Sequence, residues 1–354
     1  MNRSVPVLCW WRLYTDGPVH GTVSMSDSAI TSPRTASAET RGLAFGLLGV
    51  AIFSLTLPMT RLAVGTAADP QLPPLFVTAG RAACAGLLSC AWLWAMHARR
   101  PGRHLLPALL VSALGTVVGF PLFLALALRR VDAMHAAVVA GVLPLATALV
   151  AALWLRQRPS RGFWACAVVA TTLVVAFAAW SGGGHLVIAD GLLLASVFSA
   201  AIGYVAGARL AGEMPPESAI CWVLVTSLPL TIPATLLVWP QQGASTAAWG
   251  GFAYVTVFSM WLGFFAWYRG LALGGTMRVS QVQAVQPFLA MFFAVPILGE
   301  RLDPAMLLFA AAVVAVVVLG RRMSVGAVRQ RTPSFPPQAP AARAAISPSW
   351  RTPS

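Results

Sequence analysis

Polar side chains gather on one face of the apolar segment 276–298, and their types suit reversible binding of a ligand. At about 100° per residue, this face spans roughly a third of the helix circumference. It holds Thr276, Ser280, Gln283, Gln286 and Pro287. Hydroxyl and amide groups both donate and accept hydrogen bonds. The face is therefore interpreted either as the wall of a cavity for polar ligand atoms or as a source of hydrogen bonds between neighbouring helices, worth about 0.6–2 kcal/mol each.

Aromatic side chains form a second group with a helical spacing. Trp261, Phe264 and Tyr268 lie three and seven positions apart in the segment 249–272, and Tyr204 lies in another apolar segment. Aromatic rings can hold amphipathic or cationic molecules by stacking and cation–π attraction. We predict that Trp261, Tyr268 and Tyr204 contribute to the cavity wall. Packing between helices, or a belt at the lipid interface, is the alternative.

Three ionisable residues are candidates for gating or coupling. His135 can titrate near neutral pH and relay protons, or it can be an ordinary solvated or capped histidine. Arg81 lies about seven residues inside the segment 74–96. There it can reach the membrane surface by snorkelling or attract an anionic ligand. Glu300 follows the segment 276–298, where a helix-end hydrogen bond or a partnership with Arg301 is the alternative to coupling.

Motifs for covalent or metal chemistry are missing from the sequence. It has no Walker A motif, no HExxH motif, no CxxC pair and no cluster of His and Asp. We therefore predict no metal, no cofactor and no catalytic residues. An intramembrane lipid-modifying enzyme would need a nucleophile, paired carboxylates or a metal cluster at the membrane edge. That enzyme and a non-transporting membrane scaffold remain the alternative interpretations.

The composition indicates which elements position these residues. Of 354 residues 58% are hydrophobic and only 10% are charged, with a mean hydropathy of +0.76. Soluble chains carry about 25% charged residues, so lipid is the expected solvent. A bilayer core needs about 20 apolar residues per helix. We predict an all-α integral membrane protein with ten transmembrane helices, at about 43–64, 74–96, 105–127, 133–155, 163–180, 188–210, 219–239, 249–272, 276–298 and 304–320.

The arginines predict how the chain crosses the membrane. All 24 basic residues are arginine, scattered in short polar gaps and tails, which speaks against nucleic-acid binding. With the N-terminus in the cytoplasm, nineteen arginines lie inside and three outside. Both termini are therefore expected in the cytoplasm.

The polar residues 1–41 and the proline-rich residues 323–354 are predicted to be disordered cytoplasmic tails. Met25 is a plausible start, so residues 1–24 are interpreted as a mis-assigned extension.

An internal repeat divides the chain into two halves. Pro144 and Pro287 lie 143 positions apart in similar apolar contexts, and both are predicted to kink their helices. Arg-Leu-Ala ends two further segments, at 61–63 and 209–211. The halves are predicted at 42–180 and 188–322, with five helices each. Because five is odd, the second copy must be inverted across the membrane, as in many secondary transporters that bind substrate at the repeat interface.

The end of the second half carries a family resemblance. The stretch from Pro287 to Leu298-Gly299-Glu300-Arg301-Leu302, preceded by residues 268–272, resembles the end of an EamA-type repeat of the drug/metabolite transporter superfamily. Residues 76–81 resemble the start of that family's second helix, and the likeness spans about 42–320. In the first half Arg156-Gln157-Arg158-Pro159 replaces the usual Gly-Glu-Arg-Leu, so the motif's glutamate is missing there.

The resemblance implies carrier-type movement, often export, of amino acids, drugs or other small metabolites. We therefore expect a secondary transporter working by alternating access in the cell inner membrane. Its expected partners are a small-molecule substrate and the lipid bilayer, with no nucleic acid. A homodimer is compatible with this interpretation.

Overall fold

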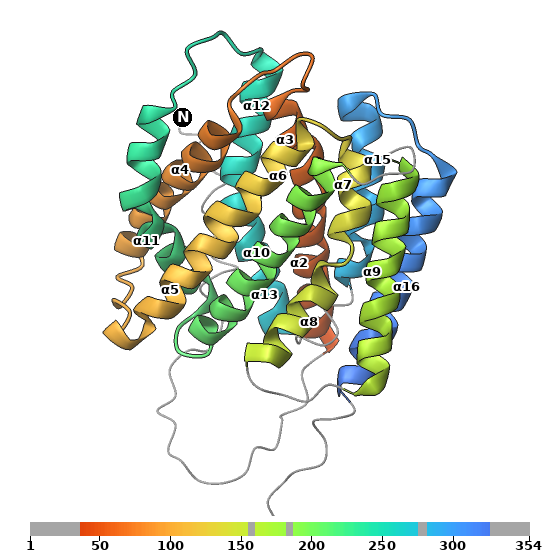
Figure 1. Ribbon diagram of the computed structural model, residues 1–354. Coiled ribbons are helices and arrows are strands. Elements are labelled where there is room, and N and C mark those ends of the chain that lie inside the picture. The colour runs from red at the N-terminus through yellow and green to blue at the C-terminus, as the bar shows by residue number, and fades with distance from the viewer. Residues whose placement is uncertain (1–35, 155–159, 182–186, 275–281, 326–354) are drawn as a thin grey trace, which may run out of the picture. The chain divides into compact units, whose positions relative to one another are not determined.

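A computed structural model describes residues 36–154, 160–181, 187–274 and 282–325, and these residues are helical almost throughout (Figure 1). Within these ranges the only β interaction is an isolated bridge between Gly65 and Pro70. This agrees with the all-α prediction. Residues 1–35 and 326–354 of the predicted tails lie outside the described residues, as do Thr276 and Ser280. The prediction of disorder is wrong for residues 36–41 and 323–325, which are helical.

Eight helical segments are long and apolar enough to cross a membrane. They are α2 with α3 (Ala36–Ser54, Thr56–Val64), α4 (Pro74–Ala95), α5 with η2 and α6 (Leu106–Ser112, Ala113–Gly119, Phe120–Leu128), α7 with α8 (Ala133–Ala140, Leu143–Trp154), α9 (Arg161–Ser181), α10 (Ile188–Ala211), α11 (Pro216–Leu237), and α12 with η3 and α13 (Thr246–Tyr254, Val255–Leu262, Gly263–Gly274).

The last two predicted windows contain shorter apolar stretches among the described residues, 283–298 and 304–320. A 3₁₀ turn η4 (Gln283–Val285) leads into α15 (Gln286–Leu298), and α16 (Pro304–Val325) follows. The start of the ninth window, up to residue 281, falls outside the described ranges. The structure is therefore that of a multi-pass membrane protein.

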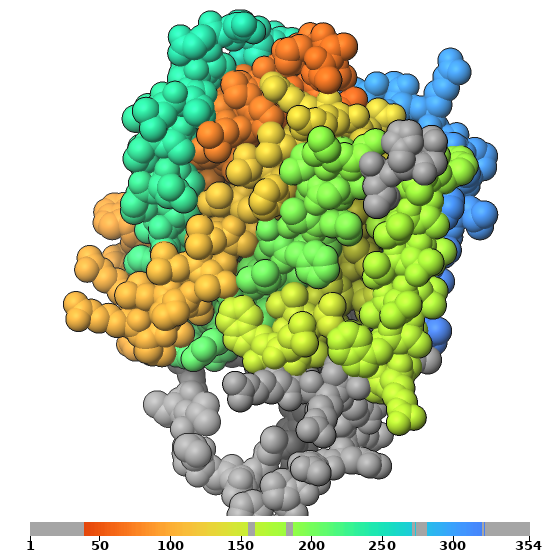
Figure 2. All heavy atoms as spheres, viewed as in Figure 1, coloured from red at the N-terminus to blue at the C-terminus, as the bar shows by residue number. Residues whose placement is uncertain are grey.

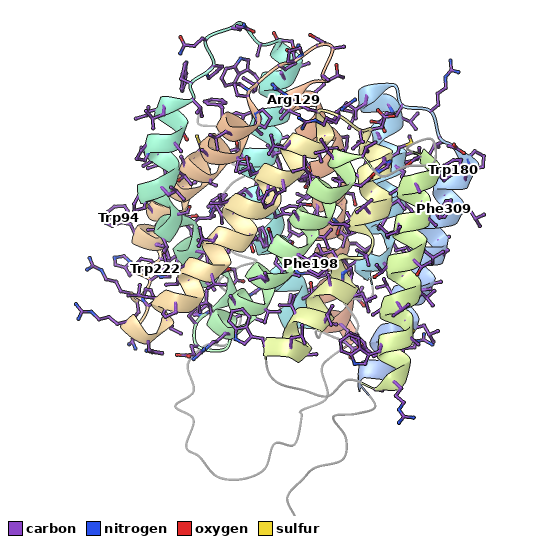
Figure 3. The ribbon with its side chains drawn as sticks, in the orientation of Figure 1. Trp94, Arg129, Trp180, Phe198, Trp222 and Phe309 are labelled. Carbon is purple, nitrogen blue, oxygen red and sulfur yellow. The ribbon has the colours of Figure 1, made fainter. Side chains whose placement is uncertain are left out.

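Large apolar side chains cover the outside of the helices. Leu237 is 85% exposed, Trp94 83% and Leu308 72%. Figure 3 shows Trp94 and Phe198 on the surface of different helices. Water would oppose so much exposed apolar surface, whereas lipid tails solvate it at little cost.

Several helices are interrupted near their middle. The chain turns at Leu55 between α2 and α3, and again at Gly141–Val142 between α7 and α8. The segments η2 and η3 are π-helical, a form that frequently marks functional sites. Pro144 and Pro287 each stand at the second position of the helix that follows an interruption. Because proline lacks an N–H, it is tolerated there and disfavoured deeper in a helix.

Helices from the two halves of the chain lie side by side. Helix α4 packs along α11, α9 packs along α16, and α10 packs along α5, η2 and α6 (Figures 1 and 2). The loops 65–73, 129–132, 238–245 and 299–303 lie at one end of the bundle, which is at the top of Figure 1 and is called the upper end below.

Glycine permits some of these close approaches. A Cβ atom added at Gly251 in α12 would lie 2.6 Å from the Met59 carbonyl oxygen and 3.0 Å from the Ala63 nitrogen in α3. The neighbouring Gly250 has no atom within 4 Å of the same added Cβ. Small residues at a helix interface let two backbones touch.

We therefore expect Gly251→Ala to destabilise the protein by about 1–3 kcal/mol through overpacking. Gly250→Ala is the matched control at an exposed position and should be neutral or stabilising by about 0.5–1 kcal/mol, because alanine favours the helix. Thermal unfolding of the two purified variants in detergent measures the difference. Equal melting temperatures would show that α12 and α3 are not in backbone contact.

Candidate functional site

A cavity of about 890 Å³ lies between helices of both halves. Its wall is largely apolar, with a polar minority from α3, α4, η2, α10, η3, η4, α15 and α16. The hydroxyl-bearing residues that line it are Thr56, Thr116, Ser196, Tyr204 and Ser259. The other polar lining residues are Arg81, Gln283, Gln286 and Arg322. This volume and composition suit a small organic molecule.

The cavity is closed toward the upper end of the bundle. Lining residues in that direction are buried, among them Leu124, Ala137 and Leu193 with at most 2% exposure. In the opposite direction the wall includes Arg322, near the end of α16, which is exposed. The cavity therefore runs from the interior toward the lower end, opposite the loops named above.

Arg81 lies in the wall of this cavity and does not snorkel. Its side chain is 2% exposed, because α4 is covered by α11, α6 and η3. Its Nη2 atom donates to the Ser259 hydroxyl over 3.3 Å. The expectation that Arg81 reaches the membrane surface is thus corrected.

The helix interruptions place hydroxyl groups at the cavity. Thr56 follows the turn at Leu55, and its hydroxyl lies 2.8 Å from that of Ser259 in η3. Ser54, just before the turn, donates to the carbonyls of Val50 and Gln286 over 2.7 and 3.3 Å. The break in the first span is therefore tied to the eighth and ninth helical segments by polar contacts.

The predicted polar face of 276–298 reaches the cavity in part. Gln283, Gln286 and Pro287 line it, as does Pro144 from α8. Thr276 and Ser280 lie outside the described residues. Each proline is the second residue of its helix, α8 or α15. The two prolines therefore mark where these helices begin in the cavity wall.

Only part of the aromatic group lines the cavity. Tyr204 and Phe264 line it, whereas Trp261 and Tyr268 lie outside its wall. All four belong to one apolar cluster, which also holds Trp222 and Phe265. Trp261 belongs to η3, where the wider π turn offsets the spacing of 100° per residue used to predict a common face.

His135 is buried at the upper end and is not solvated. It is 6% exposed, and its Nε2 atom lies 2.7 Å from Asp190 Oδ1 at the start of α10. The Ser181 hydroxyl at the end of α9 lies 3.1 Å from its Nδ1 atom. The other oxygen of Asp190 accepts from the Val187 N–H over 2.9 Å. The polar cluster His135–Asp190–Ser181 thus joins α7, α9 and α10, away from the cavity wall.

Glu300 also forms a contact at the upper end. Its two carboxylate oxygens accept from the backbone N–H groups of Ala133 and Met134, at 2.7 and 2.9 Å. Burial raises the pKa of Glu300 above its ordinary value, and the two backbone N–H groups oppose that shift. Glu300 therefore makes a helix-end hydrogen bond, but at the start of α7 and not at the end of its own helix.

Sequence reasoning missed six polar residues. Asp190 is buried against His135, and the other five line the cavity: Thr56, Thr116, Ser196, Ser259 and Arg322. One available signal was the spacing of Thr116 and Ser259, which are 143 positions apart, as are Pro144 and Pro287. Asp190 gave no such signal, because a carboxylate at a helix start is already explained by the helix dipole.

Apolar helices around a cavity with a polar minority in its wall are the architecture of a multi-pass membrane protein that can hold a small molecule. A model of the EamA-like transporter family matches residues 40–178 and 187–321, and the chain belongs to this family. The resemblance found at Leu298–Leu302 is thereby confirmed. The chain is 41% identical over 287 residues to "Uncharacterized transporter YdeK" of Bacillus subtilis (strain 168), which covers 80% of this chain and 98% of that protein. A solved crystal structure is similar in fold, with a TM-score of 0.54 and 18% identity over 79% of this chain and 98% of that one.

Proposed function

We propose that the protein is a secondary transporter that moves a small metabolite by alternating access, in the direction of export. The observation that carries this proposal is the cavity of about 890 Å³, because its wall is built from residues of both stretches that the family model matches. A site between two similar units can open to either side when the units exchange conformations.

Positions in the two halves correspond in a way that supports an inverted repeat of five helices each. Thr116 and Ser259 both lie in π-helical segments at the cavity, 143 positions apart. Thr56 and Tyr204 also line it, 148 positions apart, which is the spacing of the two Arg-Leu-Ala segments.

The helix pairs follow the same correspondence. The second and seventh helical segments pack together, and so do the fifth and tenth, as α4 with α11 and α9 with α16. The first packs on the eighth, as α3 with α12, and the sixth packs on the third, as α10 with η2 and α6. A twofold relation between the halves would produce each of these pairings.

The distribution of arginine supports an inner-membrane orientation with both termini in the cytoplasm. The upper end then faces outward, and the cavity reaches the cytoplasmic side. In this state the outer side is closed by the Glu300 contact with α7 and by the cluster of His135, Asp190 and Ser181. Alternating access requires the Glu300 contact to break when the outer side opens.

Transport by the purified protein tests the proposal. Liposomes that contain it should show saturable uptake or efflux of at least one compound in a panel of amino acids, organic acids and amphipathic drugs, with and without a pH gradient. Empty liposomes should show none. A lipid-modifying enzyme would instead change the mass spectrum of the liposome lipids, and a scaffold would do neither. Absence of saturable flux across the whole panel contradicts the proposal.

Gln283→Ala should lower transport of that compound about three- to tenfold without lowering the amount of protein in the membrane, because one neutral hydrogen bond is worth about 0.5–1.5 kcal/mol. Gln241→Ala, in the exposed loop 238–245, is the control and should leave the rate unchanged. An unchanged rate for Gln283→Ala would remove this side chain from the substrate contacts.

A further inference from the structure

Arg81 carries a positive charge that the described part of the protein leaves without a counter-ion. Its guanidinium is 2% exposed and lines the cavity. Its single hydrogen bond, from Nη2 to the Ser259 hydroxyl, is 3.3 Å long. Among the described residues, Nε and Nη1 are buried and have no partner. Guanidinium has five N–H donors, so most of its hydrogen-bonding capacity is unused.

Burial of this kind is costly unless something compensates for it. An ionised group inside a membrane protein is usually paired, or faces a site where it acts. A structural arginine would be expected to hold several carbonyls, as Arg129 does with Val64 and Leu72. Arg81 holds one hydroxyl, so its environment is incomplete in the empty protein. A ligand that brings a negative charge would complete it.

The cavity favours an anion as a whole. Two arginines line it, Arg81 in the interior and Arg322 toward the lower end, and no Asp or Glu of the described residues does. A cation would meet like charge along this path. The Thr116 hydroxyl also lines the cavity and has no partner among the described residues, so it can donate to an anionic oxygen.

The form of the site indicates which anion it accepts. A planar guanidinium matches a carboxylate by two parallel N–H···O bonds. A phosphate carries about two negative charges and recruits several donors, whereas this cavity offers one buried cation. The rest of the wall is apolar, with Phe53, Phe120 and Phe264 among the lining residues.

We propose that Arg81 is the anchor for the substrate's carboxylate, and that the substrate class is a small carboxylic acid with an apolar or aromatic body. The carboxylate binds Arg81 with help from the hydroxyls of Thr116 and Ser259, and the body lies against the phenylalanines. This identification rests on the proposed transport function, because it assigns the substrate of the same cavity.

Binding to the detergent-purified protein tests the assignment independently of transport. Phenylacetate and longer arylalkanoates should raise the melting temperature in a saturable manner. The neutral phenylacetamide, the cationic phenethylamine and inorganic phosphate should not. In Arg81→Met the apparent affinity for the carboxylates should fall on the order of a hundredfold, as when one partner of a buried charged pair is removed. Arg81→Lys should retain part of it, because lysine keeps the charge but not the paired donors.

The stability of the ligand-free variants separates a binding role from a structural one. Replacing a buried, unpaired charge by methionine should leave the ligand-free melting temperature unchanged or higher. A strong loss of ligand-free stability in both Arg81→Met and Arg81→Gln would make Arg81 a structural residue and overturn the proposal. Equal effects of phenylacetate and phenylacetamide on wild-type protein would overturn it even if no variant folds, and so would a larger Arg81-dependent response to phosphate.

Transport measurements distinguish a failure of the anion site at Arg81 from a failure of the proposed carrier function. Carboxylates that bind through Arg81 but never cross the liposome membrane would sustain the anion site and contradict the carrier function. Saturable transport of neutral or cationic compounds that is unaffected by Arg81→Met, with no carboxylate binding, would sustain the carrier and contradict the anion site.

Discussion

Asp190→Ala is expected to destabilise the protein by about 3–5 kcal/mol, the cost of removing one partner of a buried polar pair. Asp190 is 4% exposed and His135 is 6% exposed, and their side chains meet over 2.7 Å. Without the carboxylate, the buried imidazole keeps only the Ser181 hydroxyl as a partner, and the start of α10 loses the bond from the Val187 N–H.

Asp303→Ala provides the matched control for this substitution. Asp303 also stands at the start of a helix, where it accepts from the Ala305 N–H over 2.8 Å, but it has no histidine partner in the described structure. Its loss should cost about 1 kcal/mol, as for an ordinary helix cap. The difference between the two variants therefore measures the contact with His135 apart from the cap.

Unfolding by SDS titration in mixed micelles measures both values. The double variant His135→Leu/Asp190→Ala should lose less unfolding free energy than the two single variants lose together, because neither partner is then left unpaired. The difference, the coupling energy, should be about 1–3 kcal/mol. Equal losses in Asp190→Ala and Asp303→Ala would show that the histidine contact contributes nothing to the stability of the fold.

Much of the helical architecture was predictable because lipid imposes it. A segment of about 20 apolar residues has few structures available in a bilayer other than a helix. Composition and hydropathy alone therefore located the eight segments that are long and apolar enough to cross a membrane. Pro144 and Pro287 each lie beside an interruption between helical elements. Helix ends and apolar periods are local properties, which a sequence displays directly.

The site was less predictable because it depends on the neighbours of each helix. Arg81 is the clearest example. Its distance from the start of α4, about 10 Å at 1.5 Å per residue, allows snorkelling, and only the packing of α11, α6 and η3 against α4 prevents it. Trp261 shows a second cause, since a π-helical turn changes which side chains share a face and leaves no obvious mark in the sequence.

The arginines at the upper end illustrate the same limit and lead to the other prediction with a large expected effect. From the sequence, Arg61 and Arg129 are charges near the membrane surface. In the structure Arg129 donates to the carbonyls of Val64 and Leu72, both at 3.2 Å. Arg61 donates in return to the carbonyls of Leu128 and Val131. Each arginine thus binds the last carbonyl of the other's helix, Val64 or Leu128, where positive charge also complements the helix dipole, and one carbonyl in a neighbouring loop.

Arg129→Met should therefore destabilise the protein by about 2–4 kcal/mol, because it removes two hydrogen bonds from a charged donor to partly buried backbone carbonyls. Methionine preserves most of the apolar stem, so lost packing contributes little. Figure 3 shows Arg129 near the upper end of the bundle, in the region where α3 and α6 end. SDS titration and the melting temperature of the purified variant provide the measurement.

Arg130→Met is the control that isolates this effect. Arg130 is exposed, and within the described ranges its side chain bonds only to the Leu126 carbonyl of its own helical turn. Its replacement should change stability by less than about 0.5 kcal/mol. Both variants remove one arginine from the same loop, so they alter the charge that directs membrane insertion equally. A loss confined to Arg129→Met would therefore be due to the reciprocal arginine contacts, whereas equal losses in the two variants would mean that these residues act only as charges at the membrane surface.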